Sequence, residues 1–519
     1  APAPAYRAAE AADGPRTGLA YPRPLPAGMP PVVPPAAGER YQPIDANPVR
    51  LASEHPVSTF SIDVDTGSYA NVRRLLVAGR LPPPDAVRVE EMINYFPYDY
   101  AGPRDGHPFA VHLDLVESPW REGAQLLRIG IKGEDRARAS LPPANLVFLV
   151  DVSGSMNSPD KLPLLKASLK LLAERLRAQD RLSLVSYASG TQLVLPATPG
   201  SDKATILAAI DALRAGGATA GASGIELAYR VAQQARIEGG INRILLATDG
   251  DFNVGITDFR QLEAMVAVRR KAGIALSTLG FGTGNYNEHL MERLADAGDG
   301  AHAYIDSLME GHKVLVDQAA STLETIAGDV KIQVEFNPAR VREYRLIGYE
   351  NRLLAREDFH DDKVDAGEIG AGHSVTALYE ITPVGAPGRI EALRYGKRDS
   401  APASAGGSGA TAGEIAFVQL RYKRPGARDS VLMARPVAAG AARSLAASDT
   451  DTRFAVAVAG FGELLRGGRH SGDWDWATLR RLAQGARGED AFGYRGEFLR
   501  LVDLAAALEP RPGTLPAAR

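Results

Sequence analysis

The chain has 519 residues, enough for about three domains, and its 45% hydrophobic and 23% charged residues are ordinary for a globular protein. A net charge of −3 and a pI near 6.4 provide no basic surface for nucleic acid, so no nucleic-acid partner is expected. The chain contains no cysteine, which excludes disulfides, thiolate metal sites and cysteine nucleophiles. No run of about 18 apolar residues occurs, so no transmembrane span is expected.

Residues 1–46 are dominated by alanine, proline and glycine, a composition that builds no core and predicts a disordered, extended spacer. The chain starts at Ala1 without a methionine, so we expect that a preceding segment has been removed. A spacer at such a terminus suits a tethered, exported protein. It equally suits an ordinary disordered tail.

Folded sequence is predicted from residue 47 onward, beginning with a strand, a helix over 69–78 and a second helix that ends at Tyr95. The runs "FAVHLDLVES" and "AQLLRIGIKG" alternate with period two, as do several runs after residue 331, which predicts antiparallel strands. Each group alone has too few strands to bury a face, so we expect them to form one β-sandwich. A helical segment then carries Trp474 and Trp476 as core anchors.

Residues 143–330 have a different pattern. "NLVFLVD" is a continuous apolar run of the kind that forms a strand covered on both faces, and further such runs alternate with helical patterns. This order predicts a doubly wound, mostly parallel α/β sheet, closed by an amphipathic helix over 308–326. The fold class is therefore an α/β domain inserted in an antiparallel β-sandwich, with small α-helical segments near both ends.

The predicted boundaries follow these changes of pattern along the chain. They are 1–46 for the spacer, 47–107 for an N-terminal domain, 108–140 for strands that pair with 331–440, 143–330 for the α/β domain, 331–440 for the rest of the β-sandwich, 441–510 for a helical domain and 511–519 for a tail.

Oxygen-bearing side chains follow three predicted elements of the α/β domain. "LVDVSGSM" places Asp151, Ser153 and Ser155 at the carboxyl end of the first strand, where open α/β sheets hold their ligands. The turn "GGATAGAS" offers Thr219, and "RILLATDGDFN" ends a third strand in Asp249, where the glycine that follows permits a sharp turn. Oxygen-only ligands suit a hard divalent cation. Helix caps would explain any one of these motifs, but not all three together.

The three motifs resemble the metal-ion-dependent adhesion site of the von Willebrand factor type A domain. The resemblance implies that Ser153, Ser155 and Thr219 ligate the metal directly or through water. It also implies that Asp151 and Asp249 act as ligands or orient ligated waters. Mg²⁺ is the expected cation, with Mn²⁺ and Ca²⁺ as alternatives. A shell rich in neutral hydroxyls leaves the metal's charge uncompensated, so we expect a protein partner that presents Asp or Glu to the metal.

Other segments extend the resemblance to a family of bacterial type A domain proteins, many of which are lipoproteins, with a characteristic N-terminal domain and a C-terminal domain of unknown function. These segments are "DVDTGSYANVRR", "MINYFPYDY", "LGFGTGNYNE" and "RGEFLRLVDLA". The resemblance implies a periplasmic or cell-envelope protein that binds a partner. It also implies a lipid anchor upstream of Ala1.

Two other functions remain as alternatives to a non-enzymatic envelope protein. The first is an intracellular metal-dependent assembly factor that works with a separate ATPase. The second is a metal-dependent phosphatase, because "FSIDVDTGS" places Asp63 and Asp65 as in an Asp-x-Asp nucleophile motif. The helices and antiparallel strands that follow do not suit a phosphatase. We therefore expect Asp63, Asp65 and Ser68 to cap the next helix, or to bind a structural cation.

Overall fold

The structure is a computed structural model. It describes residues 41–62, 65–218, 221–250, 259–284, 286–364, 366–391, 413–440 and 442–509. No helix within those ranges is both long and apolar enough to cross a membrane.

The α/β domain is built on a six-stranded sheet in the order β10-β9-β8-β5-β6-β7, in which only the edge strand β7 is antiparallel. Its strands are β5 (Ala144–Asp151), β6 (Arg181–Tyr187), β7 (Thr191–Pro199), β8 (Ile241–Thr248), β9 (Ala275–Phe281) and β10 (His302–Ile305). The helices between them are α3 (Leu162–Arg175), α4 (Lys203–Ala212), α5 (Gly221–Gln234), α6 (Phe259–Arg270) and α7 (Glu288–Ala297).

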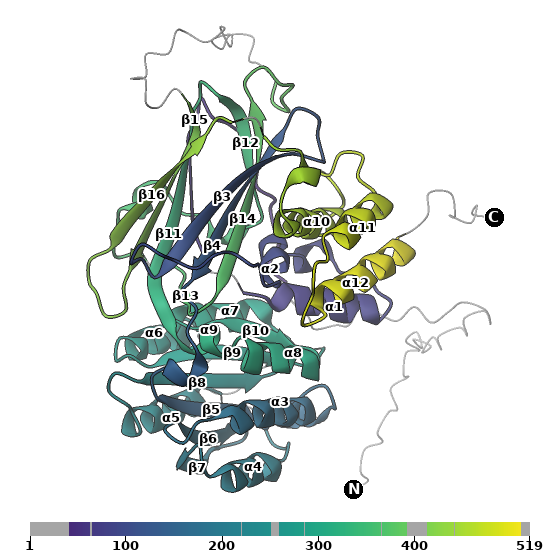
Figure 1. Cartoon of the computed structure of the whole chain (residues 1–519). Coiled ribbons are helices and arrows are strands. Elements are labelled where there is room, and N and C mark those ends of the chain that lie inside the picture. Colours follow the sequence, from purple (N-terminus) through teal and green to yellow (C-terminus); the bar gives the residue numbers. More distant parts are fainter. Residues whose placement is uncertain are drawn as a thin grey trace, which may run out of the picture. The chain divides into compact units, whose positions relative to one another are not determined.

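Helices on both faces explain why strand β5 is apolar from Leu146 to Val150. Leu146, Phe148 and Val150 pack in one core with helices α3 and α4, whereas Val147 and Leu149 pack in another with α5 and α6. In Figure 1 these two pairs of helices lie on opposite sides of the sheet. The polar residues of β5, Asn145 and Asp151, accordingly lie near its two ends.

The antiparallel strands form two sheets with one apolar core between them. The first contains β1 (Arg50–Leu51), β12 (Val341–Ile347), β14 (Ser374–Pro383), β4 (Gln125–Gly133) and β3 (Phe109–Glu117). The second contains β13 (Ile369–Gly370), β11 (Thr325–Phe336), β15 (Glu414–Lys423) and β16 (Val431–Ala438), with β2 (Val57–Ser61) paired to β11.

Strand β4 precedes the α/β domain in sequence, and strand β14 follows it. The two pair along their length, for example Ile131 with Val375 and Leu127 with Tyr379. The predicted fold class is therefore confirmed: the α/β domain is an insertion between strands of one β-sandwich (Figure 1).

Helices from the two ends of the described chain share a single core. They are α1 (Gly67–Val77), α2 (Val89–Asn94), α10 (Thr450–Leu465), α11 (Trp476–Gly485) and α12 (Tyr494–Leu508). The ring of Phe96 packs edge-on against Phe454 and Phe498, with ring centroids 4.8 and 5.6 Å apart. As expected of core anchors, Trp474 and Trp476 pack against this core. The sequence patterns separated these helices into two domains and did not predict their union.

The helix expected over residues 308–326 is confirmed over most of its length, but it is interrupted by a π-helical turn and ends at Leu323. The segment consists of α8 (Leu308–His312), a π-helical turn η4 (Lys313–Asp317) and α9 (Ala319–Leu323), and strand β11 already starts at Thr325. Thr325 pairs with Gly370, and the next residue, Ile326, is buried in the sandwich core. Strand pairing therefore overrides the helical pattern at its end.

Short 3₁₀ turns connect several of these elements. They are η1 (Pro84–Ala86), η2 (Arg138–Ser140), η3 (Gly154–Asn157), η5 (Glu350–Arg352), η6 (Glu357–Phe359) and η7 (Leu445–Ala447).

A buried arginine joins the helical core to the α/β domain. The guanidinium of Arg73 on α1 donates to Asp306 after β10, to Glu310 on α8 at 2.8 Å and to Glu497 on α12 at 2.9 Å. Arg73 is itself buried, so its charge is compensated by these acids and not by water.

Replacing Arg73 with methionine should lower the free energy of unfolding by about 3–5 kcal/mol, because it leaves buried carboxylates without their cation. Urea denaturation followed by fluorescence measures the change. The matched control is Arg80→Met, an exposed position just beyond α1, which should cost about 0.5 kcal/mol or less. Equal stability of the two variants would contradict this role for Arg73.

Candidate metal centre at the ends of strands β5 and β8

The order of the sheet brings two of the predicted acidic residues together. Strand β5 pairs with β6 on one side and with β8 on the other. After β5 the chain first adds β6 and β7 on one side of it and then adds β8, β9 and β10 on the other side, so the strand order reverses between β5 and β8. Asp151 is the last residue of β5, and Asp249 directly follows β8. Both carboxylates therefore lie at the carboxyl edge of the sheet, at its topological switch point.

The side chain of Asp151 is fully buried, and its oxygens accept hydrogen bonds from three neighbours. The Ser153 backbone N–H donates to Oδ1 at 2.9 Å. The hydroxyls of Thr248 and Tyr187 donate to Oδ2 at 2.8 and 3.3 Å. These donors hold the carboxylate in one orientation, with its remaining lone pairs available to a cation.

Burial raises the pKa of Asp151 to about 6, from an ordinary value near 3.8. The hydrogen bonds from Ser153 and Thr248 act in the opposite direction, and the nearby charge of Asp249 raises the pKa further. The two carboxylates therefore repel each other in a region with little water, an arrangement that a bound cation would relieve.

The two predicted serines lie side by side. The hydroxyls of Ser153 and Ser155 form a hydrogen bond with their oxygens 3.0 Å apart, and the Ser153 side chain does not cap the turn η3. Ser153 is buried, whereas Ser155 is exposed. The pair thus reaches from the buried carboxylates to the protein surface.

The glycine-rich turn expected to carry Thr219 is held against the loop that carries the serines. Gly154 donates its N–H to the carbonyl of Gly217 at 2.9 Å, and Gly216 donates to the carbonyl of Val152 at 2.8 Å. Thr219 itself lies outside the described residues, so its ligand role stays a prediction.

Asp249 is also fully buried, and it has a partner that the sequence patterns did not predict. The ammonium of Lys161 donates to Asp249 Oδ2 at 2.9 Å, and the lysine side chain is 7% exposed. The chain then turns at Gly250, whose φ of +84° confirms the sharp turn expected there. A side chain on Gly250 would also meet the backbone of Asn287 at 2.9 Å.

The chemistry of this site is that of hydroxyls and carboxylates in a fixed arrangement. Among the described residues, no group of three or more His, Asp or Glu converges as a metal site. Sequence reasoning missed Tyr187, Thr248 and Lys161 as partners of the two acids. Thr248 could have been identified from the sequence, because it belongs to the Thr-Asp-Gly motif. No sequence pattern points to Tyr187 or Lys161.

The helix-capping interpretation of Asp65 and Ser68 is wrong. Asp65 accepts hydrogen bonds from the His302 backbone N–H at 2.8 Å and from Arg352 at 3.1 Å, so it joins the α/β domain to the sandwich. The Ser68 hydroxyl donates to the carbonyl of Ala86, and the N-cap residue Thr66 makes no side-chain capping bond. The carboxylate of Glu91 instead accepts the Ser68 backbone N–H at 2.9 Å. Asp63 lies outside the described residues.

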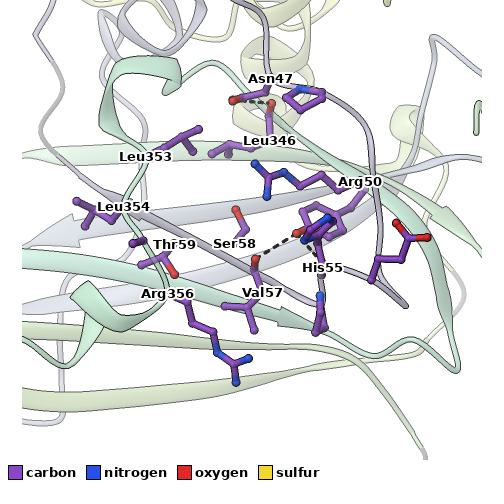
Figure 2. Close-up of a pocket in the computed structure, with 15 residues that line it drawn as sticks. Asn47, Arg50, His55, Val57, Ser58, Thr59, Leu346, Leu353, Leu354 and Arg356 are labelled. Carbon is purple, nitrogen blue, oxygen red and sulfur yellow. Dashed lines mark hydrogen bonds between the residues drawn. The ribbon is translucent and has the colours of Figure 1, made fainter.

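A separate pocket of about 410 Å³ lies on the β-sandwich, between strands β1, β2 and β12 and residues 353–356 (Figure 2). Figure 2 shows Arg50 reaching across it between Leu346 and Ser58. The Tyr344 hydroxyl donates to the carbonyl of His55 at 2.8 Å at one side of the pocket. None of the predicted metal ligands lines this pocket, so it is not part of the candidate metal centre.

Three protein-family models match the chain. The model described as "von Willebrand factor type A domain" matches residues 145–318, and one described as "von Willebrand factor" matches residues 35–128. A model described as "Uncharacterized protein YfbK, C-terminal" matches residues 321–508.

Similar whole proteins are also found. YfbK of Escherichia coli (strain K12) is 49% identical over 474 residues, which cover 90% of this chain and 81% of that protein. Protein sll0103 of a Synechocystis species is 32% identical over 186 residues, covering 36% of this chain and 43% of its own. Among solved structures, a von Willebrand factor type A protein from Catenulispora acidiphila aligns with a TM-score of 0.39 at 16% identity, covering 76% of this chain and 91% of that one.

Proposed function

Because this chain belongs to the YfbK family of bacterial proteins that contain a von Willebrand factor type A domain, we propose that it binds a protein partner through a divalent cation. The domain itself suggests a protein-interaction or adhesion role. The cation would lie at the ends of β5 and β8, and Mg²⁺ is the proposed ion. The partner would supply an Asp or Glu side chain to that ion.

The spacing of the two serine hydroxyls is the observation that carries the proposal. Neighbouring ligands of an octahedral Mg²⁺, each about 2.1 Å from the metal, lie about 3.0 Å apart. The Oγ atoms of Ser153 and Ser155 are separated by 3.0 Å, so the pair fits two adjacent ligand positions. Ser153, Ser155 and Thr219 would hold the ion, and the buried Asp151 and Asp249 would hold it or orient its waters.

The charges around the site favour an acidic partner. The ion would supply a positive charge and an open position for one more oxygen. The serine hydroxyls are neutral, and the charge of Asp249 is already offset by Lys161. The chain therefore neutralises only part of a divalent charge, and a carboxylate from a partner would complete the shell. Ser155, exposed at the surface, marks the side from which the carboxylate would approach.

The same contacts support binding without turnover. A metal that activates water is ordinarily accompanied by a base or a second metal. Asp151 already accepts three hydrogen bonds and Asp249 is paired with Lys161, so each carboxylate is committed to a neighbour. We therefore propose that the chain binds a partner and is not a phosphatase.

We also propose that the protein lies at the cell envelope, with the Ala/Pro-rich residues 1–46 as a spacer to a lipid anchor. The composition of that segment suits such a spacer. The alternative, an intracellular assembly factor beside a separate ATPase, predicts recovery in the cytosol. Cell fractionation with an antibody to the chain distinguishes the two.

Isothermal titration with Mg²⁺, Mn²⁺ and Ca²⁺ should show one site, and Asp151→Ala or Ser153→Ala should weaken binding by about tenfold or more. The control is Ser140→Ala, which removes an exposed hydroxyl outside the α/β domain and should leave the affinity unchanged. Unchanged binding in a folded Asp151→Ala, Ser153→Ala double variant would overturn the assignment.

Capture of a partner should require both the cation and the site. We expect a partner to bind the purified chain in Mg²⁺ and to be released by EDTA. Thr219→Ala should abolish capture while the melting temperature in EDTA stays unchanged, because the glycines of the turn remain. Neutralising one Asp or Glu on the identified partner should have the same effect. Metal-dependent hydrolysis of phosphate esters or peptides, lost in Asp249→Ala, would instead favour an enzyme.

A further inference from the structure

We propose that Lys161 is an internal cation that competes with the divalent ion for Asp249 and so sets how tightly the site holds metal. This inference rests on the proposed function, and it assigns a role to a residue outside the predicted ligand set. Lys161 stands immediately before helix α3, and Asp249 follows strand β8, 88 residues later.

The contact between these residues is buried and direct. The Lys161 ammonium lies 2.9 Å from Asp249 Oδ2, with the two side chains 7% and 0% exposed. A pair so far from solvent is screened little by water or salt, so each charge strongly affects the other. Removal of either partner would cost the other a buried, charge-assisted hydrogen bond.

The path of the lysine side chain is shaped by a glycine. A Cβ atom on Gly282, just after strand β9, would lie 2.3 Å from Lys161 Cγ and 2.4 Å from its Cε. The absence of a side chain at Gly282 therefore leaves the space that the aliphatic part of the Lys161 side chain occupies between its backbone and Asp249. The Tyr304 hydroxyl donates to the Gly282 carbonyl at 2.8 Å and holds this turn in place.

The lysine changes the charge that a metal would meet. Asp151 and Asp249 together carry a charge of −2, and the ammonium reduces it to −1. A divalent ion that ligates Asp249, or orders water on it, has to share the carboxylate with Lys161 or displace the ammonium. Both outcomes weaken the ion's binding relative to a site without the lysine. The occupancy of a weaker metal site varies with the cation concentration and increases when a partner's carboxylate binds the ion.

A purely structural role for Lys161 predicts a different result. If the lysine only anchored the start of helix α3, its removal would loosen the loops at the site and metal affinity would fall. Competition predicts that the affinity rises. The direction of the change in metal affinity therefore separates the two roles.

The test compares Lys161→Met with the full-length wild type by Mg²⁺ titration calorimetry and by melting temperature in EDTA and in Mg²⁺. We expect a lower melting temperature in EDTA, because Asp249 loses its cation, and a larger rise on addition of Mg²⁺. The dissociation constant for Mg²⁺ should fall by about tenfold or more. Lys166→Met is the matched control: this helix α3 lysine donates to backbone carbonyls of Asp211 and Leu213, away from the acids.

A second variant displaces the lysine without removing its charge. Gly282→Ala places a methyl group against the Lys161 stem and should also tighten Mg²⁺ binding. Gly284→Ala is its control, because Gly284 has a similar positive φ of +96° but nothing within 4 Å of its Cβ position. Gly282→Ala also keeps the test informative if Lys161→Met does not fold.

Unchanged or weaker Mg²⁺ binding in the folded Lys161→Met and Gly282→Ala variants, with wild-type binding intact, would overturn competition and leave the proposed function standing. Absence of any metal-dependent heat or melting shift in the wild type would overturn the proposed function, and this inference with it.

Discussion

Asp151 and Asp249 end two adjacent parallel strands, and both side chains are withdrawn from solvent. The sheet that carries them is covered by helices on both faces, and strand β5 accordingly has apolar side chains from Leu146 to Val150 and polar ones only near its ends. Two like charges brought together in this way need compensation. Hydrogen bonds from Ser153, Thr248 and Tyr187 serve Asp151, and the Lys161 ammonium serves Asp249. Compensation of these two buried negative charges therefore determines which side chains surround the candidate centre.

Buried ion pairs also hold the inserted α/β domain against the rest of the chain. The domain is bounded by strand β4 before it and strand β11 after it, and charged side chains also tie it to its surroundings. Arg73 binds acids from α8 and α12, and Asp65 accepts from His302 and from Arg352. Such buried ion pairs depend on accurate geometry and lose their value when one partner moves. They therefore favour one placement of the domain over others.

Much of this organisation could be predicted from periodicity. Continuous apolar runs predicted the parallel strands, alternating runs predicted the sandwich, and turn residues located Asp151, Ser153, Ser155 and Asp249 at strand ends. Long-range pairing could not be predicted. Lys161 reaches Asp249 only because Gly282, 121 positions later, leaves room for its stem, and no local pattern records that approach. The shared core of the terminal helices was not predicted either, because it depends on contacts between distant segments. Another distant contact, the pairing of Thr325 with Gly370, ends the helix predicted over 308–326 early.

Under the proposed function, a lysine inside the centre links metal binding to partner binding. A chain that held the ion with two uncompensated carboxylates would bind it tightly and would leave it less attractive to a third. Where Lys161 offsets Asp249, the ion binds the chain less strongly and retains more of its charge for the partner. Ion and partner then each raise the other's affinity by the same factor, since coupling between two ligands is reciprocal. A site of this kind favours the complete assembly of chain, ion and partner over any pair of them.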